Sequence, residues 1–492
     1  MSQPNILLII TDQQRFDSLG CYGFEAAHTP NLDRLANQGL LFEHCYVNNP
    51  ICTPSRASLM TGQHLPGHGV YQQYDNLPDD QVLFTEYLQQ LGYHTALFGK
   101  LHVCSRYTEV YQRHPRDGFD VYEWCLEHNI DLDSPLNGYA RWLQSVDLVF
   151  YQQLCRQGRK LLHVPREVHM THWAAERTID YIDNSDNPFF CAMSVFDPHN
   201  PYQDYPLEIG DLIDEEKIPD PFVLESDFEE TLPTLKRLSI EGGNARKLSK
   251  EELRQMRFGY HASIALIDLE VGRVLEALDH KGIVDNTLVI FVSDHGDMLG
   301  DRLQMTKGGF FYDACVRVPL LMRWPDRFSR GRRVTSLVQL HDLAATILSA
   351  AGMSAVELQQ IMPDAVDLIP ACAGEADHTH DYAYCFYRNS SLGGRNTNSP
   401  YFDPPVQATM IRSDQFKMNL YHATNDAIQL MGEGQLFDMK TDPNEVNNLW
   451  YNANYADVRR HLVQQMMAFL IQQEVRYCGQ RGGEALPSKW RS

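Results

Sequence analysis

Four polar residues that could share a metal ion stand at the ends of two apolar segments far apart in the chain. Asp12 and Gln13 follow the run NILLIIT, and Asp294 and His295 follow TLVIFVS. In open parallel sheets, ligands bind at the carboxyl ends of the strands. A hard divalent cation needs several oxygen or nitrogen groups that converge from different elements. We therefore predict a metal site here, although a single aspartate at a strand end is as often a helix N-cap.

A candidate nucleophile lies at the start of a predicted helix. In the segment CTPSRASLMTG, Pro54 stands two residues after Cys52, near the first helical turn. A helix N-terminus favours anionic groups and nucleophiles, so the Cys52 sulfur is placed for chemistry. Arg56 follows one turn later, where its planar guanidinium could bind an anion. The eleven cysteines are odd in number and scattered, which is typical of reduced thiols rather than of disulfides.

The elements that must hold these residues form an alternating pattern. Apolar runs of strand length alternate with helical patterns, which predicts a parallel sheet with helices on both faces. The predicted strands are NILLIIT, LLFEHCYV, HTALFG, PFFCAMSVF and TLVIFVSD, and the predicted helices include VLFTEYLQQLG, HWAAERTIDYID, a long helix over 251–279 and HDLAATILSAAG. The fold class is therefore α/β.

Cys-x-Pro-Ser-Arg followed by Leu-Met-Thr-Gly resembles the signature of the type I sulfatases of the alkaline phosphatase superfamily. Further motifs follow in family order, so the resemblance covers the chain from about Pro4 to Leu449. They are Asp12-Gln13, His28-Thr29-Pro30-Asn31-Leu32-Asp33-Arg34-Leu35, Phe98-Gly99-Lys100-Leu101-His102, Asp197-Pro198-His199-x-Pro201-Tyr202, Ser293-Asp294-His295-Gly296-Asp297, Leu436-Phe437-Asp438 and Asp442-Pro443-x-Glu445-x-Asn447-Asn448-Leu449. The resemblance implies an alkaline phosphatase-like, doubly wound, mostly parallel sheet with a smaller C-terminal α+β subdomain.

The resemblance also implies a sulfuric ester hydrolase with a modified cysteine. In this family the cysteine matched by Cys52 is oxidised to formylglycine (3-oxoalanine) by a formylglycine-generating maturase. One hydroxyl of the hydrated aldehyde attacks sulfur while bound to the metal, and deprotonation of the other reforms the aldehyde and expels sulfate. Serine could not perform this second step.

Roles for further residues follow from their places in the motifs. Lys100 and His102 match the sulfate-binding lysine and the histidine that contacts formylglycine. His199 and Lys307 match the pair at the leaving-group oxygen. The resemblance thus implies catalytic residues Cys52, Arg56, Lys100, His102, His199 and Lys307, substrate binding by Lys100, His199 and Lys307, and metal ligands Asp12, Gln13, Cys52, Asp294 and His295.

The two pairs of candidate metal ligands depart from the commonest sulfatase pattern. Many sulfatases carry Asp-Asp and Asp-Asn where this chain has Asp12-Gln13 and Asp294-His295. The latter pairing also resembles phosphonate monoester hydrolases and related phosphodiesterases, which keeps that activity as the alternative. An imidazole ligand and one carboxylate fewer make manganese more acceptable, so the ion is open between calcium, which we favour, and manganese. A catalytically silent binding protein of this fold is a third reading, disfavoured because every matched motif is intact.

Composition limits the partners. The chain of 492 residues carries a formal charge of −22, a field that repels nucleic acid and anionic membranes. There is no apolar run of 18 residues and no secretory signal pattern, so we expect no membrane span and a cytoplasmic location. The expected substrate is a small-molecule or carbohydrate sulfate ester bound in a locally positive pocket. The oligomeric state stays open between a monomer and a homo-oligomer.

The chain is long enough for a large domain with an appendage. We predict a catalytic domain over 1–375 and a C-terminal subdomain over 376–492. Two segments, about 104–170 and 203–250, break the alternation and are either functional lids or disordered inserts. Aromatic residues of the first could stack on a substrate ring or could simply pack the insert against the domain; they are Tyr107, Tyr111, Trp142 and Tyr151.

Overall fold

The fold centres on one large mixed sheet. The computed structural model describes residues 3–186, 188–229, 245–389, 405–422 and 433–477, together with 232, 234, 235 and 238. Nine described strands form this sheet in the order β4-β3-β5-β1-β6-β8-β2-β7, with β9 paired to β2. Their bounds are β1 Asn5–Thr11, β2 Leu40–Tyr46, β3 His94–Gly99, β4 Val121–Trp124, β5 Phe189–Ser194, β6 Thr287–Ser293, β7 Arg317–Val318, β8 Leu320–Arg323 and β9 Arg332–Gln339.

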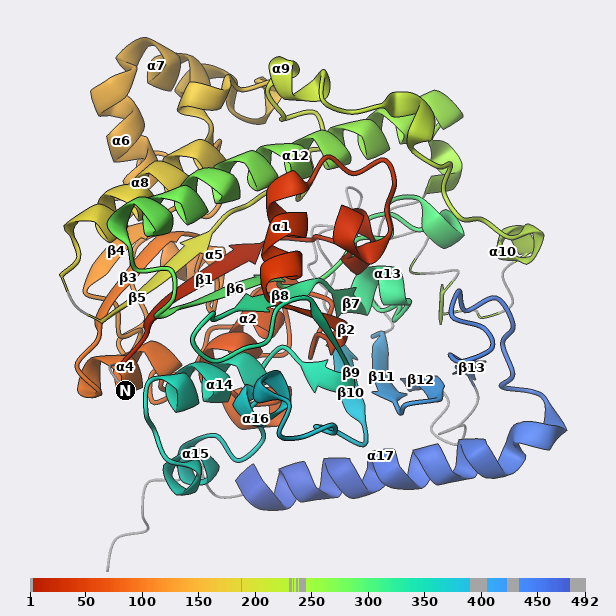
Figure 1. The fold of residues 1–492 in the computed structure, drawn as a ribbon. Helices are drawn as coiled ribbons and strands as arrows, with labels where there is room; N and C mark the ends of the chain where they lie inside the picture. Colours follow the sequence, from red (N-terminus) through yellow and green to blue (C-terminus); the bar gives the residue numbers. More distant parts are fainter. Residues whose placement is uncertain are drawn as a thin grey trace, which may run out of the picture.

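Helices cover both faces of the sheet (Figure 1). Side chains alternate along a strand, so Ile6, Leu8 and Ile10 of β1 enter one apolar core and Leu7 and Ile9 enter the other. The first core includes α2 Cys52–Thr61, α4 Phe84–Gln90, α14 Asp342–Ala350 and α16 Ile369–Ala373. The second includes α1 Pro30–Gln38, α6 Gly138–Val146, α7 Leu148–Gln157, α8 Met170–Asn184 and α12 Lys250–Lys281.

Strand direction divides the sheet in two. From β4 to β6 all neighbours are parallel, whereas β8 runs antiparallel to both β6 and β2. Parallel strands end at the same edge, so the residues that follow β1, β3, β5 and β6 meet there. The predicted α/β class, with a mostly parallel sheet and helices on both faces, is confirmed.

A smaller antiparallel sheet lies in the C-terminal part of the chain, as predicted. It contains β10 Ala383–Arg388, β11 Gln407–Arg412, β12 Phe416–His422 and β13 Glu433–Asp438. Helix α17, Ala456–Tyr477, packs against it through Leu462 and Met466, and Figure 1 shows this helix along the lower edge of the molecule. The boundary between residues 375 and 376 stays a prediction.

The first of the two segments that break the alternation, about 104–170, is folded against the main sheet. It contains α5 Arg106–Glu109, β4, α6 and α7. Trp142 stacks on Tyr139 with ring centroids 6.0 Å apart, and both it and Tyr151 pack against the core, while Tyr107 and Tyr111 are exposed. The second segment contains α9 Leu207–Gly210 and α10 Glu225–Glu229, and part of it lies outside the described residues. A lid role for either segment stays a prediction.

The remaining α-helices of the described residues are short connections around this framework: α3 Leu65–His68, α13 Asp313–Val316 and α15 Ala355–Ile361. Within the described part of the chain, no helix combines the length and the apolar character needed to cross a membrane.

Candidate active site

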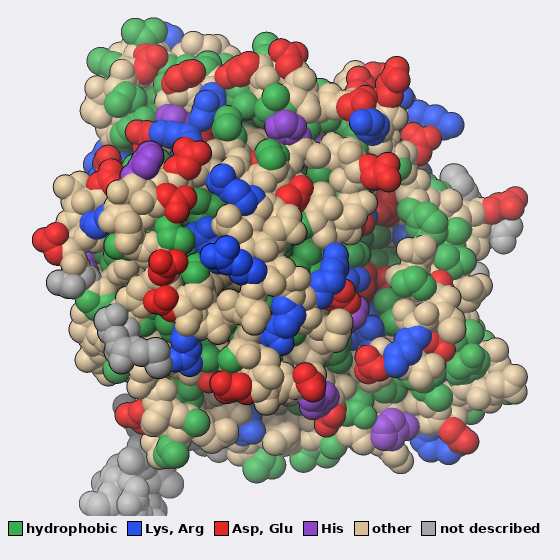
Figure 2. All heavy atoms as spheres, in the orientation of Figure 1, with side chains coloured by type: hydrophobic (Ala, Val, Ile, Leu, Met, Phe, Trp, Pro, Cys, Tyr) green, Lys and Arg blue, Asp and Glu red, His purple; other side chains and the backbone are tan. Residues whose placement is uncertain are grey.

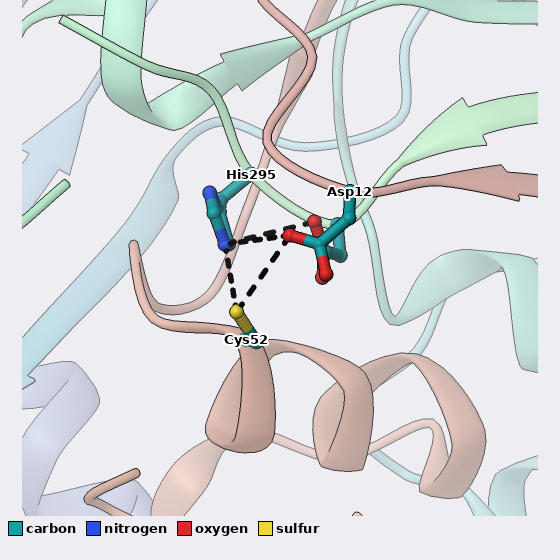
Figure 3. A group of neighbouring side chains, drawn as sticks. Asp12, Cys52 and His295 are labelled. Atoms are coloured by element: carbon teal, nitrogen blue, oxygen red, sulfur yellow. Dashed lines mark hydrogen bonds and ion pairs between the residues drawn. The ribbon is translucent and has the colours of Figure 1, made fainter. Parts of the chain in front are cut away.

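Two neighbouring strands bring four candidate metal ligands together. Thr11 of β1 lies opposite Ser293 of β6, so the residues that follow, Asp12 and Asp294, are adjacent. Ligand atoms of Asp12, Cys52, Asp294 and His295 all lie within 4.8 Å of one another, and all four residues are buried. Figure 3 shows Asp12, Cys52 and His295 pointing toward one common point, with Cys52 at the end of its helix.

The donor set fits a divalent cation. His295 Nδ1 lies 2.9 Å from the carbonyl oxygen of Gly296, so the lone pair is on Nε2, which faces Asp12, Asp294 and the Cys52 sulfur. Burial lowers the pKa of His295 to about 4, so the ring is neutral, as a metal ligand must be. The Oε1 atom of Gln13 is buried without a hydrogen-bond partner among the described residues. A cation would satisfy that oxygen.

Cys52 is the first residue of α2, as the position of Pro54 predicts. The helix is buried along its whole length and ends at Gly62, whose φ of 66° suits glycine. The Cys52 sulfur lies 2.9 Å from Lys307 Nζ, 3.2 Å from His295 Nε2 and 3.7 Å from Asp12 Oδ1. Burial raises the pKa of the Cys52 thiol, but the neighbouring cations outweigh this and bring that pKa below its ordinary value.

Arg56 connects the helix to the group of candidate metal ligands. Its Nε donates to Asp294 Oδ2 at 2.6 Å, and its Nη1 donates to the Lys100 carbonyl and to Ser194 Oγ, both at 2.9 Å. Its Nη2 has no hydrogen-bond partner within the described residues and lies 3.7 Å from Asp12 Oδ2. Arg56 therefore orients Asp294 and leaves one donor available.

Lys100 and His102 come from the end of β3. Gly99 has a φ of 114°, and a Cβ on it would lie 1.8 Å from the carbonyl oxygen of Ser194, so only glycine allows this close approach. Strand geometry does not continue to His102, whose φ is 59°. The two side chains nevertheless both enter the site: Lys100 pairs with Asp12, and His102 Nε2 lies 3.1 Å from Thr53 Oγ1.

His199 and Lys307 meet beside Cys52. His199 Nε2 lies 2.9 Å from Lys307 Nζ, and His199 Nδ1 lies 2.7 Å from the Asn200 carbonyl oxygen. Since only a protonated Nδ1 can donate to that carbonyl, Nε2 is the acceptor from Lys307. Burial, followed by the charge of Lys307, lowers the pKa of His199 and favours this neutral form.

Three supporting residues were not singled out from the sequence. Asp297 accepts from Gln13 Nε2 at 2.6 Å, Ser55 Oγ donates to the Asp294 carbonyl at 2.5 Å, and Glu109 accepts from the backbone of residues 102–104. Asp297 and Ser55 belong to the sequence motifs named above, so their positions in those motifs could have identified them. Glu109 lies outside these motifs, in the segment 104–170, and the sequence carried no signal for it.

Comparison with known proteins finds similarity to sulfatases. A family model described as Sulfatase matches residues 4–353, and one described as N-sulphoglucosamine sulphohydrolase, C-terminal, matches residues 305–472. An N-acetylglucosamine-6-O-sulfatase of Bacteroides thetaiotaomicron is 26% identical over 94% of this chain and 85% of its own length. An arylsulfatase of Clostridium perfringens is 28% identical over 92% of each chain. The solved phosphonate monoester hydrolase of Agrobacterium radiobacter shares the fold, with a TM-score of 0.79, 24% identity and 96% coverage of both chains.

Proposed function

This chain belongs to the sulfatase family and is a sulfuric ester hydrolase, and we propose that it cleaves its substrates with a formylglycine formed from Cys52 by a maturase. The observation that carries the proposal is the position of residue 52: it begins a buried helix and contacts Lys307, His295 and Asp12 at once. A hydrated aldehyde there would supply two hydroxyl groups on one carbon, one to attack sulfur and one to release the product.

Asp12, Gln13, Asp294 and His295 are proposed to hold one divalent cation beside residue 52. Such an ion, calcium or manganese, would supply positive charge next to the attacked sulfur. The protein's own residues prepare its place, because Arg56 holds one Asp294 oxygen while the Gln13 backbone N–H donates to the other at 3.0 Å. Family members generally use a metal and formylglycine; the identity of the ion here is part of the proposal.

The sulfate oxygens are proposed to lie against Lys100, Arg56 and Lys307. These cations are buried around residue 52 in a protein whose formal charge is −22, so they provide the local positive pocket that an anionic substrate needs. Their charges also restrain Asp12: burial raises the pKa of this carboxyl, but the surrounding cations, Lys100 foremost, hold it well below its ordinary value. The carboxylate therefore stays ionised and available as a ligand.

Lys307 is proposed to be the proton donor to the leaving oxygen, with His199 holding it in place. His199 accepts from Lys307 through Nε2 while its own proton is engaged by the Asn200 carbonyl. In this arrangement the transferable proton therefore resides on Lys307 Nζ. His102, whose pKa burial lowers well below its ordinary value, is neutral and contacts Thr53 next to residue 52.

We propose a small-molecule or carbohydrate sulfate ester as the substrate, in keeping with the relative named as an N-acetylglucosamine-6-O-sulfatase. The second candidate is hydrolysis of phosphonate monoesters or phosphodiesters. Gln13 and His295 favour it, because they replace the second aspartate and the asparagine of many sulfatases. All these esters carry one negative charge, so charge alone does not choose between them.

Paired assays test the order of the two candidates. We expect a higher kcat/KM on p-nitrophenyl sulfate than on p-nitrophenyl phenylphosphonate. A preference for the phosphonate above about ten-fold, worth roughly 1.4 kcal/mol of transition-state stabilisation, would reverse the order. If neither ester is cleaved, sugar sulfates are tested next, since binding energy from remote parts of a substrate can be needed for the chemical step. The mass of the peptide that contains residue 52 tests the formylglycine separately.

A further inference from the structure

A polar cavity lies at the edge of the main sheet opposite the active site. Arg323, the last residue of β8, pairs with Val289 near the beginning of β6, whereas Asp294 follows the end of β6. The cavity measures about 380 Å³, and its lining includes Arg34, Gln38, Asp279, Asp285, Arg323 and Arg330. Figure 2 shows Lys and Arg side chains gathered on the face that carries α1 and β8 in Figure 1.

Arg323 is buried there with two unused donors. Its residue is 4% exposed, and its Nη1 donates to Gln38 Oε1 at 3.1 Å. Its Nε and Nη2 are buried and have no hydrogen-bond partner among the described residues. Leaving such donors unsatisfied is costly, more so for a charged group, so the native protein is expected to provide them with an acceptor.

The two unused donors form one edge of the guanidinium, the edge that binds two oxygens side by side. Elsewhere in this chain the same edge binds a carboxylate. Arg15 donates through Nε and Nη2 to the two oxygens of Asp17, both at 2.8 Å. Arg113 does the same to Asp117, at 2.8 and 2.6 Å. The unpaired edge of Arg323 therefore has the geometry for a bidentate oxyanion.

The net charge around the cavity favours an anion of low charge. Arg34 and Arg330 are exposed at the rim, and Asp279 and Asp285 also line it. Three arginines against two carboxylates leave about one unit of positive charge, which suits a small anion rather than a polyanion. Burial and the two neighbouring arginines lower the pKa of Arg323, although the aspartates oppose this. A bound anion would stabilise the charged form of Arg323.

We propose that the Arg323 cavity binds a small oxyanion, held by the Nε–Nη2 edge of Arg323 and by Arg34 and Arg330. Phosphate, sulfate and carboxylates share the required pair of oxygens. This site is separate from the catalytic centre and does not depend on the proposed function.

Titration calorimetry on the whole protein tests the proposal, with inorganic phosphate, sulfate and acetate at an ionic strength held constant with chloride. Arg34→Gln/Arg330→Gln removes two exposed rim charges, and Arg323→Lys removes the paired edge. Arg333→Gln is the matched control, because it removes an exposed charge of β9 that pairs with Glu43 outside the cavity. The melting temperature of each variant reports its folding.

We expect at least one of the three anions to bind with an affinity about ten-fold or more lower in the double variant and in Arg323→Lys, and unchanged in Arg333→Gln. The anion that shows this loss is the class of oxyanion that the cavity binds. The proposal is overturned if the double variant binds all three anions with the stoichiometry and affinity of the Arg333→Gln control, or if the unaltered protein binds none of them. Because the double variant alters only exposed residues, a folding failure of Arg323→Lys leaves the test intact.

Discussion

The ammonium nitrogen of Lys307 lies 2.9 Å from the sulfur of Cys52, although the two residues are 255 positions apart in the chain. The same nitrogen lies 2.9 Å from His199 Nε2, so Lys307 contacts both the candidate nucleophile and the histidine that is proposed to hold it in place. This placement gives one side chain two tasks, because its charge favours an anion at residue 52 and its proton is within reach of the departing oxygen.

Replacing Cys52 should abolish turnover without unfolding the protein. In Cys52→Ser a hydroxyl can attack once, but it lacks the second hydroxyl that would release the product. We expect loss of steady-state hydrolysis of p-nitrophenyl sulfate with an unchanged melting temperature, and Cys155→Ser, at an exposed cysteine, as the control with full activity. Repeated turnovers of Cys52→Ser at the parental rate would contradict the formylglycine mechanism.

Removing the proposed metal should silence the enzyme and remove a stabilising ligand. Asp12 and Asp294 are buried side by side, and a bound cation would offset their repulsion. Chelation is expected to abolish hydrolysis and lower the melting temperature, and Asp294→Asn to lower the metal content found by elemental analysis. Asp381→Asn, at an exposed aspartate, should keep the metal. An active preparation free of metal would refute the assignment.

The proton donor can be identified from the dependence on the leaving group. Lys307→Gln should slow hydrolysis of an alkyl or sugar sulfate about 10²- to 10⁴-fold, and slow p-nitrophenyl sulfate less, because p-nitrophenolate leaves without a proton. His199→Gln should cost less than Lys307→Gln on the same alkyl ester, since His199 holds the lysine rather than donating. Lys440→Gln, at an exposed lysine, is the control. Equal losses on both esters would argue against proton donation by Lys307.

Glu270 should make the stability of the protein depend on acid pH. Burial raises the pKa of this carboxyl, but His172, Arg166 and Arg273 outweigh it and lower that pKa to about 2. Because the folded pKa lies below the ordinary value of 4.5, the stabilisation is complete above about pH 4.5 and is lost as the pH falls toward 2.

We therefore expect Glu270→Gln to lower the free energy of unfolding by about 2 to 3 kcal/mol near pH 7, and by progressively less between pH 4.5 and 2. Denaturant unfolding across this pH range measures the difference. Glu251→Gln, at an exposed residue in the first turn of the same helix, should show no comparable pH dependence. A difference that stays constant with pH would remove the electrostatic explanation.

The sequence by itself determined the fold class and which strand ends matter. Buried parallel strands leave long apolar runs, and polar residues directly after such runs must lie at one sheet edge, so Asp12 and Asp294 could be grouped before any coordinates. Pro54 likewise marked the start of the helix that carries Cys52. These signals are local, because they depend on neighbours within a few residues.

Only the tertiary structure decided which side chains contact one another and which hydrogen-bond donors stay unpaired. The sequence suggested that Arg56 could bind an anion. In the fold its Nε is taken by Asp294, which follows β6, whereas its Nη2 keeps no hydrogen-bond partner among the described residues. The antiparallel course of β8 places Arg323 at the edge away from Asp294, with two donors unpaired. Such outcomes depend on pairings between residues hundreds of positions apart, and no local pattern of residue types specifies the distance and direction on which a hydrogen bond depends.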